Sequence, residues 1–239
     1  NQRTAETLEA KLREAQATYG RQWKGLILDL RGNPGGLLDQ AVRSADLFLA
    51  TGRIAATRGR HPQSSVNHDA TEGDLAAGIP IVVLVDGRTA SGGEILSSAL
   101  QDRGRAVVVG TATYGKGLVQ TVIDLPNGGE IDLSWSRLHA PSGYALQGLG
   151  VLPNICTSGN AANRGLNGLA AGESGLAKTF AQWRTVATGN TGVRKSLRAL
   201  CPPEDGTAEA EEVARRLLSD RALFTKALAP TGAVAGLRP

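Results

Sequence analysis

The 239-residue sequence contains no methionine, not even at position 1, and only two cysteines. The missing methionine indicates a processed form or a fragment of a longer chain. Aromatic residues make up 4% of the chain, so Val, Leu, Ile and Ala must fill its core. No apolar run is long enough to span a membrane. Any association with a membrane would therefore depend on a segment removed from the N-terminus.

Charge and cysteine content exclude several classes of partner. The net charge is only +4, and no basic run is interleaved with aromatic residues, so nucleic-acid binding is not expected. Cys156 and Cys201 form no Cys-x-x-Cys motif, and so few ligands predict no metal site. Two interpretations of this pair stay open. They are two buried thiols, or one disulfide that ties the C-terminal region to the core in an oxidising compartment.

Short apolar runs bounded by glycine and proline predict an α/β architecture for residues 1–155. The expected strands are 25–30, 53–58, 81–86, 106–110, 117–125 and 129–138, the last two forming a hairpin. The expected helices are 4–16, with Thr4 as N-cap, 37–50 and 94–102. Residues 59–78 are polar and predict a long surface loop or hairpin.

The composition changes after about residue 157, where Gly, Ala, Asn and Ser become frequent and no strand pattern is present. Helical patterns return at 175–187, 191–200 and 208–228. We therefore expect residues 156–239 to form a mainly helical C-terminal extension and not a second catalytic domain.

The segment RTASGGEIL, residues 88–96, carries the first candidate for chemistry. Ser91 and Glu94 precede an apolar run, which is the pattern of a helix capping box. The same position suits a nucleophile presented at a helix N-terminus. The nine residues alone do not decide between these two roles.

Lys116 is the second candidate, and it lies between Gly115 and Gly117 at the start of an apolar strand. In an extended segment Lys116, Leu118 and Gln120 point to the same face. We expect partial desolvation of this lysine, which favours the neutral amine and lets it take a proton from a serine hydroxyl. Gln120 is placed to orient the amine, and the two glycines would let another backbone approach closely. The competing interpretation is an ordinary surface lysine at a strand end.

Two other motifs have weaker support. Residues 110–116 have the G-x-x-x-x-G-K spacing of a phosphate-binding loop, but Gly117 stands where Ser or Thr should hold Mg²⁺ and a strand follows instead of a helix. A Ser-His-Asp triad with Ser91 also stays open, because triads assemble in space. None of the three histidines, His61, His68 and His139, has a local catalytic signature.

Three blocks taken together resemble the core of the C-terminal processing (tail-specific) serine peptidases. They are LILDLRGNPGGLLDQAV, IVVLVDGRTASGGEILSSALQD and AVVVGTATYGKGLVQTVIDLPNG, followed by SGYALQGLGVLPN. The resemblance covers about residues 1–155 in the family's order. It implies a crotonase-like or Clp-protease-like α/β core of repeated strand-helix units. The PDZ domain that family members usually carry before this core is not visible. The last block resembles the family motif Pro-x-Gly followed by Gly-x-x-Pro-Asp, but its final Pro-Asp is Pro153-Asn154 here.

The resemblance implies a Ser-Lys dyad in which Ser91 is the nucleophile, Lys116 the general base and Gln120 its support. It also implies an oxyanion hole formed by the backbone N–H of Gly92 and that of Gly35 or Gly36. Preorganised donors of this kind stabilise a developing oxyanion.

The expected function is that of a serine endopeptidase that cleaves peptides or protein tails through an acyl-enzyme, with no metal or cofactor. The family places such an enzyme in the periplasm or another extracytoplasmic compartment of bacteria. The oligomeric state, including a homo-oligomer, stays open. The alternatives are a non-catalytic relative of the same fold that binds a peptide or apolar ligand, and a crotonase-type acyl-CoA enzyme in which the Ser-Lys-Gln set would have no evident task.

Overall fold

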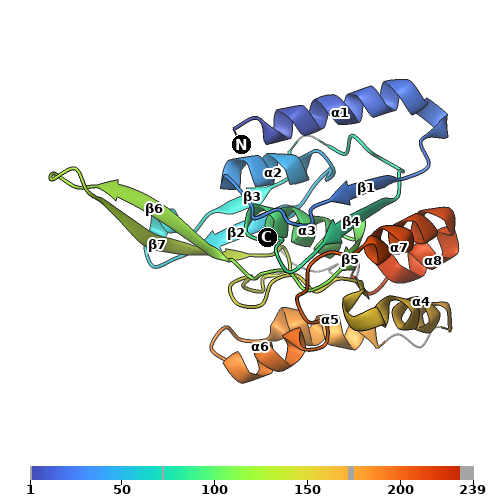
Figure 1. Cartoon of the computed structure of the whole chain (residues 1–239). Helices are drawn as coiled ribbons and strands as arrows, with labels where there is room; N and C mark the ends of the chain where they lie inside the picture. Colours follow the sequence, from blue (N-terminus) through green and yellow to red (C-terminus); the bar gives the residue numbers. More distant parts are fainter. Residues whose placement is uncertain (1, 72, 172–174, 232–239) are drawn as a thin grey trace.

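A parallel four-stranded sheet forms the centre of the computed structural model, which describes residues 2–71, 73–171 and 175–231 (Figure 1). Its strand order is β1-β4-β5-β8. The strands are β1 (Leu26–Asp29), β4 (Ile81–Val85), β5 (Ala106–Gly110) and β8 (Ile155–Cys156). Every residue of β4 and β5 is buried. Their continuous apolar sequences therefore reflect a sheet that is covered on both faces.

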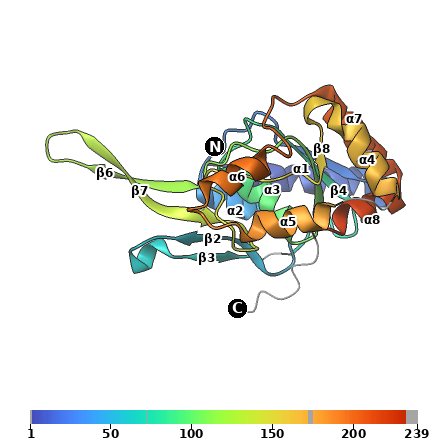
Figure 2. The same ribbon diagram turned by 90° about the horizontal axis from the view of Figure 1, so that it is seen from below.

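A second, antiparallel sheet has the order β3-β2-β7-β6. Its strands are β2 (Arg53–Arg58), β3 (Asn67–Asp69), β6 (Leu118–Asp124) and β7 (Glu130–His139). Strands β6 and β7 form the predicted hairpin, which projects from the body of the molecule in both views (Figures 1 and 2). The predicted polar loop contains β3, which pairs with β2, so the hairpin alternative for this segment is correct.

Helices cover both faces of the parallel sheet (Figure 1). Helices α1 (Thr4–Tyr19), α2 (Leu38–Asp46) and α3 (Gly92–Asp102) contribute to an apolar cluster on one face. On the other face, α4 (Ala161–Ala171), α7 (Ala208–Ser219) and α8 (Arg221–Leu228) pack on alternate residues of β4 and β5. Helices α5 (Leu176–Thr185) and α6 (Thr191–Arg198) follow α4, and short 3-10 turns span 20–22, 62–64 and 158–160. None of the helices described is both long and apolar enough to cross a membrane.

The helix predictions were wrong at three points. Arg3 occupies the N-cap of α1, and Thr4 is already the first helical residue. The expected helix over 208–228 is divided at Asp220, whose side chain accepts a hydrogen bond from Leu223 N–H and so begins a new helix. Helix α4 lies in the glycine-rich stretch for which no helix was predicted.

The C-terminal helices share a core with the central sheet. Leu166, Val213 and Phe224 belong to the same apolar cluster as Val82 and Val107. Helices are present as expected after residue 157, while a domain boundary at residue 155 stays a prediction.

Cys156 and Cys201 are joined by a disulfide, which decides between the two interpretations of this pair. Cys156 ends β8, and Cys201 follows α6. The disulfide thus ties the segment after α6 to the edge of the parallel sheet.

We expect Cys201→Ser to lower the free energy of unfolding by about 4 kcal/mol, from the loop entropy of the 45-residue separation in the chain-entropy model. Chemical unfolding of the variant and the wild type measures this difference. Wild-type protein kept in reductant should unfold at the midpoint of the variant. An unfolding midpoint that changes neither on substitution nor on reduction would exclude a stabilising disulfide.

Candidate active site

Ser91 is held in an unusual backbone conformation at the start of α3. Its φ is +50°, and it is the only non-glycine residue with positive φ among the described residues. Ser91 is half-buried. Because a positive φ is costly for a residue with a Cβ atom, such strain is found where the position has a function to serve. The conformation favours the nucleophile over a purely structural cap.

The turn after β1 lies directly against Ser91 and Gly92. A Cβ atom on Gly35 would lie 2.7 Å from Ser91 Cβ, and one on Gly92 would lie 3.3 Å from the Gly36 nitrogen. The Gly35 N–H donates to Asn33 Oδ1 at 2.9 Å. Among the described residues, the N–H groups of Gly36 and Gly92 have no acceptor. Of the two glycines considered for the oxyanion hole, the geometry therefore favours Gly36 as the partner of Gly92.

Gly35→Ala is expected to lower the free energy of unfolding by about 2 kcal/mol and to reduce activity. Its φ of +98° is unfavourable for alanine, and the new Cβ atom would collide with Ser91. Urea unfolding and substrate cleavage measure the two effects. Gly189→Ala is the control, because its Cβ position is open and its φ is not positive. Equal behaviour of the two variants would show that the turn is not packed against the nucleophile.

The buried carboxylate of Glu94 joins the segments that carry Ser91 and Lys116. Its Oε2 accepts the N–H of Ser91 at 2.8 Å and the N–H of Lys116 at 2.8 Å. Its Oε1 accepts the N–H of Gly115 at 2.6 Å and the hydroxyl of Thr113. The backbone nitrogens of Ser91 and Lys116 therefore lie no further apart than two such hydrogen bonds placed end to end.

Burial raises the pKa of Glu94, and the hydrogen bonds that its carboxylate accepts oppose this shift. The predicted capping box supplies one of these bonds, since Glu94 reaches back to the N–H of Ser91. Sequence reasoning found this local contact. It missed the contacts to residues 113–116, which no local pattern signals.

Lys116 and Gln120 are both exposed, so the expected desolvation of Lys116 is wrong for this structure. Strand β6 begins at Leu118, and Lys116 lies in the turn that leads into it. The register between β6 and β7 also shifts between Val119 and Gln120. The structure brings the backbone of Lys116 beside Ser91 through Glu94, and no interaction links the side chains of Lys116 and Gln120 among the described residues.

The glycines around Lys116 admit another backbone, as predicted. A Cβ atom on Gly117 would lie 2.8 Å from the Gln147 Cα, and one on Gly115 would lie 3.2 Å from the Gly148 nitrogen. The side chain of Arg194 in α6 in turn donates to the carbonyl oxygens of Ala145 and Gln147. Helix α6 thereby supports the segment 145–148, against which the glycines beside Lys116 pack.

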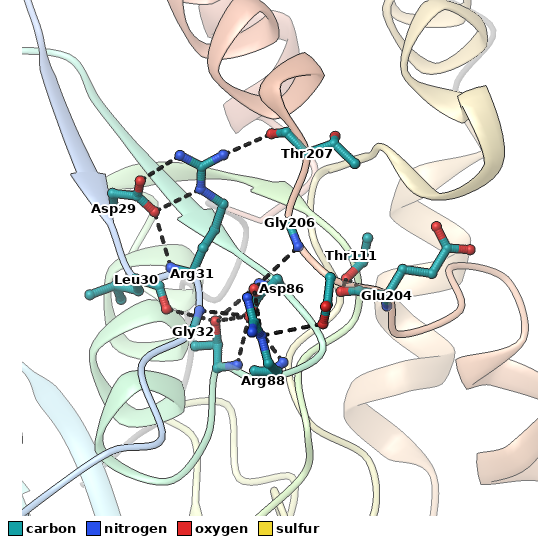
Figure 3. A network of polar contacts seen from close by, with 12 residues as sticks. Asp29, Leu30, Arg31, Gly32, Asp86, Arg88, Thr111, Glu204, Gly206 and Thr207 are labelled. Atoms are coloured by element: carbon teal, nitrogen blue, oxygen red, sulfur yellow. Dashed lines mark hydrogen bonds and ion pairs between the residues drawn. The ribbon is translucent and has the colours of Figure 1, made fainter.

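A polar network at the carboxyl ends of the parallel strands fixes the loop before Ser91 (Figure 3). Asp86, which directly follows β4, accepts hydrogen bonds from the N–H groups of Gly32, Arg88 and Thr89 at 2.9–3.0 Å. Burial alone would raise the pKa of Asp86, but these bonds and one from Gly206 lower it. The sequence analysis missed this residue. It links the turn that contains Gly35 and Gly36 to the loop that leads to Ser91.

The segment 202–207 crosses this network after the disulfide (Figure 3). Gly206 N–H donates to Asp86 Oδ2 at 3.2 Å, and the carbonyl oxygen of Glu204 accepts the N–H of Gly87 at 2.7 Å. Arg88 lies 3.3 Å from a carboxylate oxygen of Asp205. The C-terminal extension therefore contacts the loop that leads to Ser91.

A cavity of about 400 Å³ opens beside the two unpaired N–H groups. Gly36 and Gly92 form part of its wall, and apolar side chains form much of the rest, namely Leu8, Leu28, Leu30, Leu37, Ala41 and Leu96. If the carbonyl oxygen of a substrate peptide accepted hydrogen bonds from these two N–H groups, the substrate side chain next to that carbonyl would lie in this cavity.

The histidines take no part in this arrangement. His139 Nδ1 contacts the carbonyl oxygen of Gly143 at 2.8 Å, and the ring of His61 packs on Trp135. No hydrogen bond joins a histidine to Ser91 among the described residues. The phosphate-loop interpretation also has no helix at the required place, because Lys116 is followed by β6.

A strained serine at a helix start, with two unpaired N–H groups beside it, is the geometry of a serine hydrolase. Residues 1–157 match the model of Peptidase family S41. The chain belongs to this family of serine peptidases.

The relatives and solved structures that the chain resembles agree with this assignment. It is 44% identical to a carboxy-terminal-processing protease of Bartonella bacilliformis over 155 residues, which are 64% of this chain and 36% of the relative. It is 41% identical to a carboxyl-terminal-processing protease of Synechocystis sp. over 130 residues, 54% of this chain and 30% of that protein. The chain thus spans about a third of the length of these relatives.

A photosystem II D1 C-terminal processing protease resembles the chain in structure, with a TM-score of 0.57 and 32% identity. The match covers 64% of this chain and 39% of that protein. The predicted α/β class and the predicted family are confirmed.

Proposed function

We propose that this chain is a serine endopeptidase that cleaves peptides or the C-terminal tails of proteins through an acyl-enzyme. The observation that carries the proposal is the Glu94 carboxylate, which accepts the N–H groups of Ser91 and Lys116 on one oxygen. A nucleophile and a general base must act within hydrogen-bond reach, and this shared carboxylate brings their backbones together.

In the proposed reaction, Ser91 Oγ attacks the scissile carbonyl carbon while the neutral amine of Lys116 takes the hydroxyl proton. The N–H groups of Gly36 and Gly92 stabilise the oxyanion of the tetrahedral intermediate. The protonated Lys116 then gives its proton to the leaving amine, and the peptide bond breaks to leave an acyl-Ser91 ester. Water activated by Lys116 hydrolyses the ester. Gln120 would orient the amine when bound substrate brings the two side chains together, since no hydrogen bond joins them among the described residues.

The exposed position of Lys116 assigns a role to the substrate itself. A peptide lying over the turn at residues 115–117 would remove water from the Lys116 amine. The bound peptide would thereby separate the proposed base from bulk water.

The 400 Å³ cavity beside Gly36 and Gly92 is suited to an apolar substrate side chain. Its leucine-rich wall would bury such a side chain favourably. We therefore expect cleavage next to apolar residues.

The proposed location is periplasmic or otherwise extracytoplasmic. The disulfide between Cys156 and Cys201 supports it, because such bonds persist in oxidising compartments. The relatives named above include bacterial proteins.

Digestion of the unfolded protein β-casein tests the proposal. The wild-type chain should produce fragments that Ser91→Ala does not produce. Ser196→Ala is the control, since Ser196 lies exposed on α6 and should leave cleavage intact. If the wild type cleaves nothing between pH 6 and 10, the chain is a non-catalytic relative of the fold. Equal cleavage by Ser91→Ala would show that Ser91 is not the nucleophile.

A further inference from the structure

A second cavity, of about 710 Å³, lies on the antiparallel sheet and is strongly basic. Arginine and histidine side chains of β2, β7 and the turn after β2 line it, namely Arg58, Arg60, Arg137, His61 and His139. No aspartate or glutamate belongs to the described residues that line it. Trp135 adds an aromatic wall, with its ring centroid 5.2 Å from that of His61.

Two of these arginines face each other across neighbouring strands. Arg58 of β2 is the register partner of Arg137 of β7, so their side chains leave the sheet on the same face. Like charges directly opposite each other destabilise a sheet. An anion bound between the two guanidinium groups would remove this repulsion.

The arginines of the cavity are available for such an anion. Arg58 donates only to neutral groups, the carbonyl oxygens of Thr57 and Val66 and Asn67 Oδ1. Among the described residues, Arg60 and Arg137 have neither a hydrogen bond nor an ion pair. Arg53, on the same strand as Arg58, is by contrast paired with Asp69.

The cavity is adjacent to the proposed active site. Leu118 lines it and is the register partner of Arg137 on the other side of β7. Lys116 lies two residues before Leu118, which corresponds to about 7 Å along an extended chain. The carbonyl oxygen of Gly117 accepts the N–H of Leu138, so the strand pairing continues toward Lys116. A peptide at Ser91 and Lys116 would reach the cavity within a few residues of its scissile bond.

We propose that this basic cavity is a substrate subsite for a carboxylate group of the peptide, and the proposal rests on the peptidase function proposed above. Guanidinium groups bind carboxylates with paired, charge-assisted hydrogen bonds, and three of them line the cavity without a competing acid. Two sources supply this chemistry, the C-terminal carboxylate of the chain and the side chain of an acidic residue near the cleavage site.

Binding of short peptides tests the subsite separately from catalysis. The probe is a ten-residue Gly/Ser/Ala peptide with an uncharged fluorophore at its N-terminus. Its binding is measured by fluorescence anisotropy in the Ser91→Ala background, so that nothing is cleaved. Three forms are compared: a free C-terminal carboxylate, a C-terminal amide, and an amide with Asp as its last residue. We expect the free acid to bind about tenfold more tightly than the plain amide.

The double variant Arg58→Gln and Arg137→Gln should remove this preference. Arg221→Gln is the matched control, because it removes an exposed charge on α8, far from the projecting hairpin (Figure 2). Tighter binding of the Asp-terminated amide than of the plain amide, again dependent on the two arginines, assigns the site to side-chain carboxylates as well. Thermal unfolding of the double variant shows whether it is folded, and Arg60→Gln, in the turn after β2, gives an independent test.

If the protein that keeps all three arginines binds the free acid and the amide with equal affinity, or binds neither measurably, the subsite proposal is overturned. A carboxylate preference in a chain that cleaves nothing would refute the peptidase proposal and leave the subsite standing. Cleavage without any carboxylate preference would refute only the subsite.

Discussion

Lys116→Ala should reduce the cleavage rate by about 10³-fold or more while leaving the fold intact. Removal of a general base costs about 10²–10⁴ in rate, and here the same amine would also protonate the leaving group. Because the Lys116 side chain is exposed, its truncation should leave the free energy of unfolding nearly unchanged. Initial rates of peptide cleavage and a urea unfolding curve measure the two quantities.

Two further variants separate a base from a mere positive charge. Lys116→Arg keeps the charge but cannot lose a proton, so it should be as inactive as Lys116→Ala. Lys178→Ala removes an exposed lysine from α5 and should retain full activity. An active Lys116→Arg variant would show that the position contributes only charge, and another base would have to be found.

Glu94→Gln should be the most damaging single-atom change in the site. The carboxylate accepts hydrogen bonds from four donors, whereas a glutamine amide would direct its own N–H groups at two of them. We expect the free energy of unfolding to fall by about 2–4 kcal/mol, because buried donors lose their acceptor. Cleavage should fall by at least about 10²-fold, since Ser91 and Lys116 would no longer be held together.

Glu212→Gln is the control for this substitution, because Glu212 lies exposed on α7 and has no partner among the described residues. Unfolding curves and cleavage rates of both variants are compared at neutral pH. If burial kept Glu94 protonated, glutamine would replace it closely. A stable and active Glu94→Gln variant would therefore contradict the arrangement described here.

The strands of the core were predictable because their physical signal is local. Buried strands such as Ile81–Val85 and Ala106–Gly110 are short, continuous apolar runs, and β2 has the same bounds as the predicted strand. The C-terminal helices were harder. A single aspartate, Asp220, divides one periodic segment into two helices, and tertiary packing outweighs the weak helix propensity of the glycines in α4.

The candidate site was predictable where it depends on single residues in motifs. Ser91, Lys116, Gly36 and Gly92 lie in turns whose composition and family resemblance mark them. The exposure of Lys116 was not predictable, because it depends on where the turn before β6 lies relative to Ser91. The buried Glu94 network and the basic cavity were also missed, since they join residues that are distant in sequence.

The opposition of Arg58 and Arg137 illustrates this limit. It depends on the register between β2 and β7, and a shift of one residue would place the two side chains on opposite faces of the sheet. No property of either strand alone fixes that register.

Covalent labelling with a fluorophosphonate tests the central claim that Ser91 is a nucleophile activated by Lys116. The wild-type chain should gain one adduct by intact mass, and peptide mapping should place it on Ser91. The rate of labelling should drop sharply in Lys116→Ala, because that variant lacks the base that takes the serine proton. An adduct on another residue, no adduct at any pH, or an unchanged labelling rate in Lys116→Ala would contradict the account.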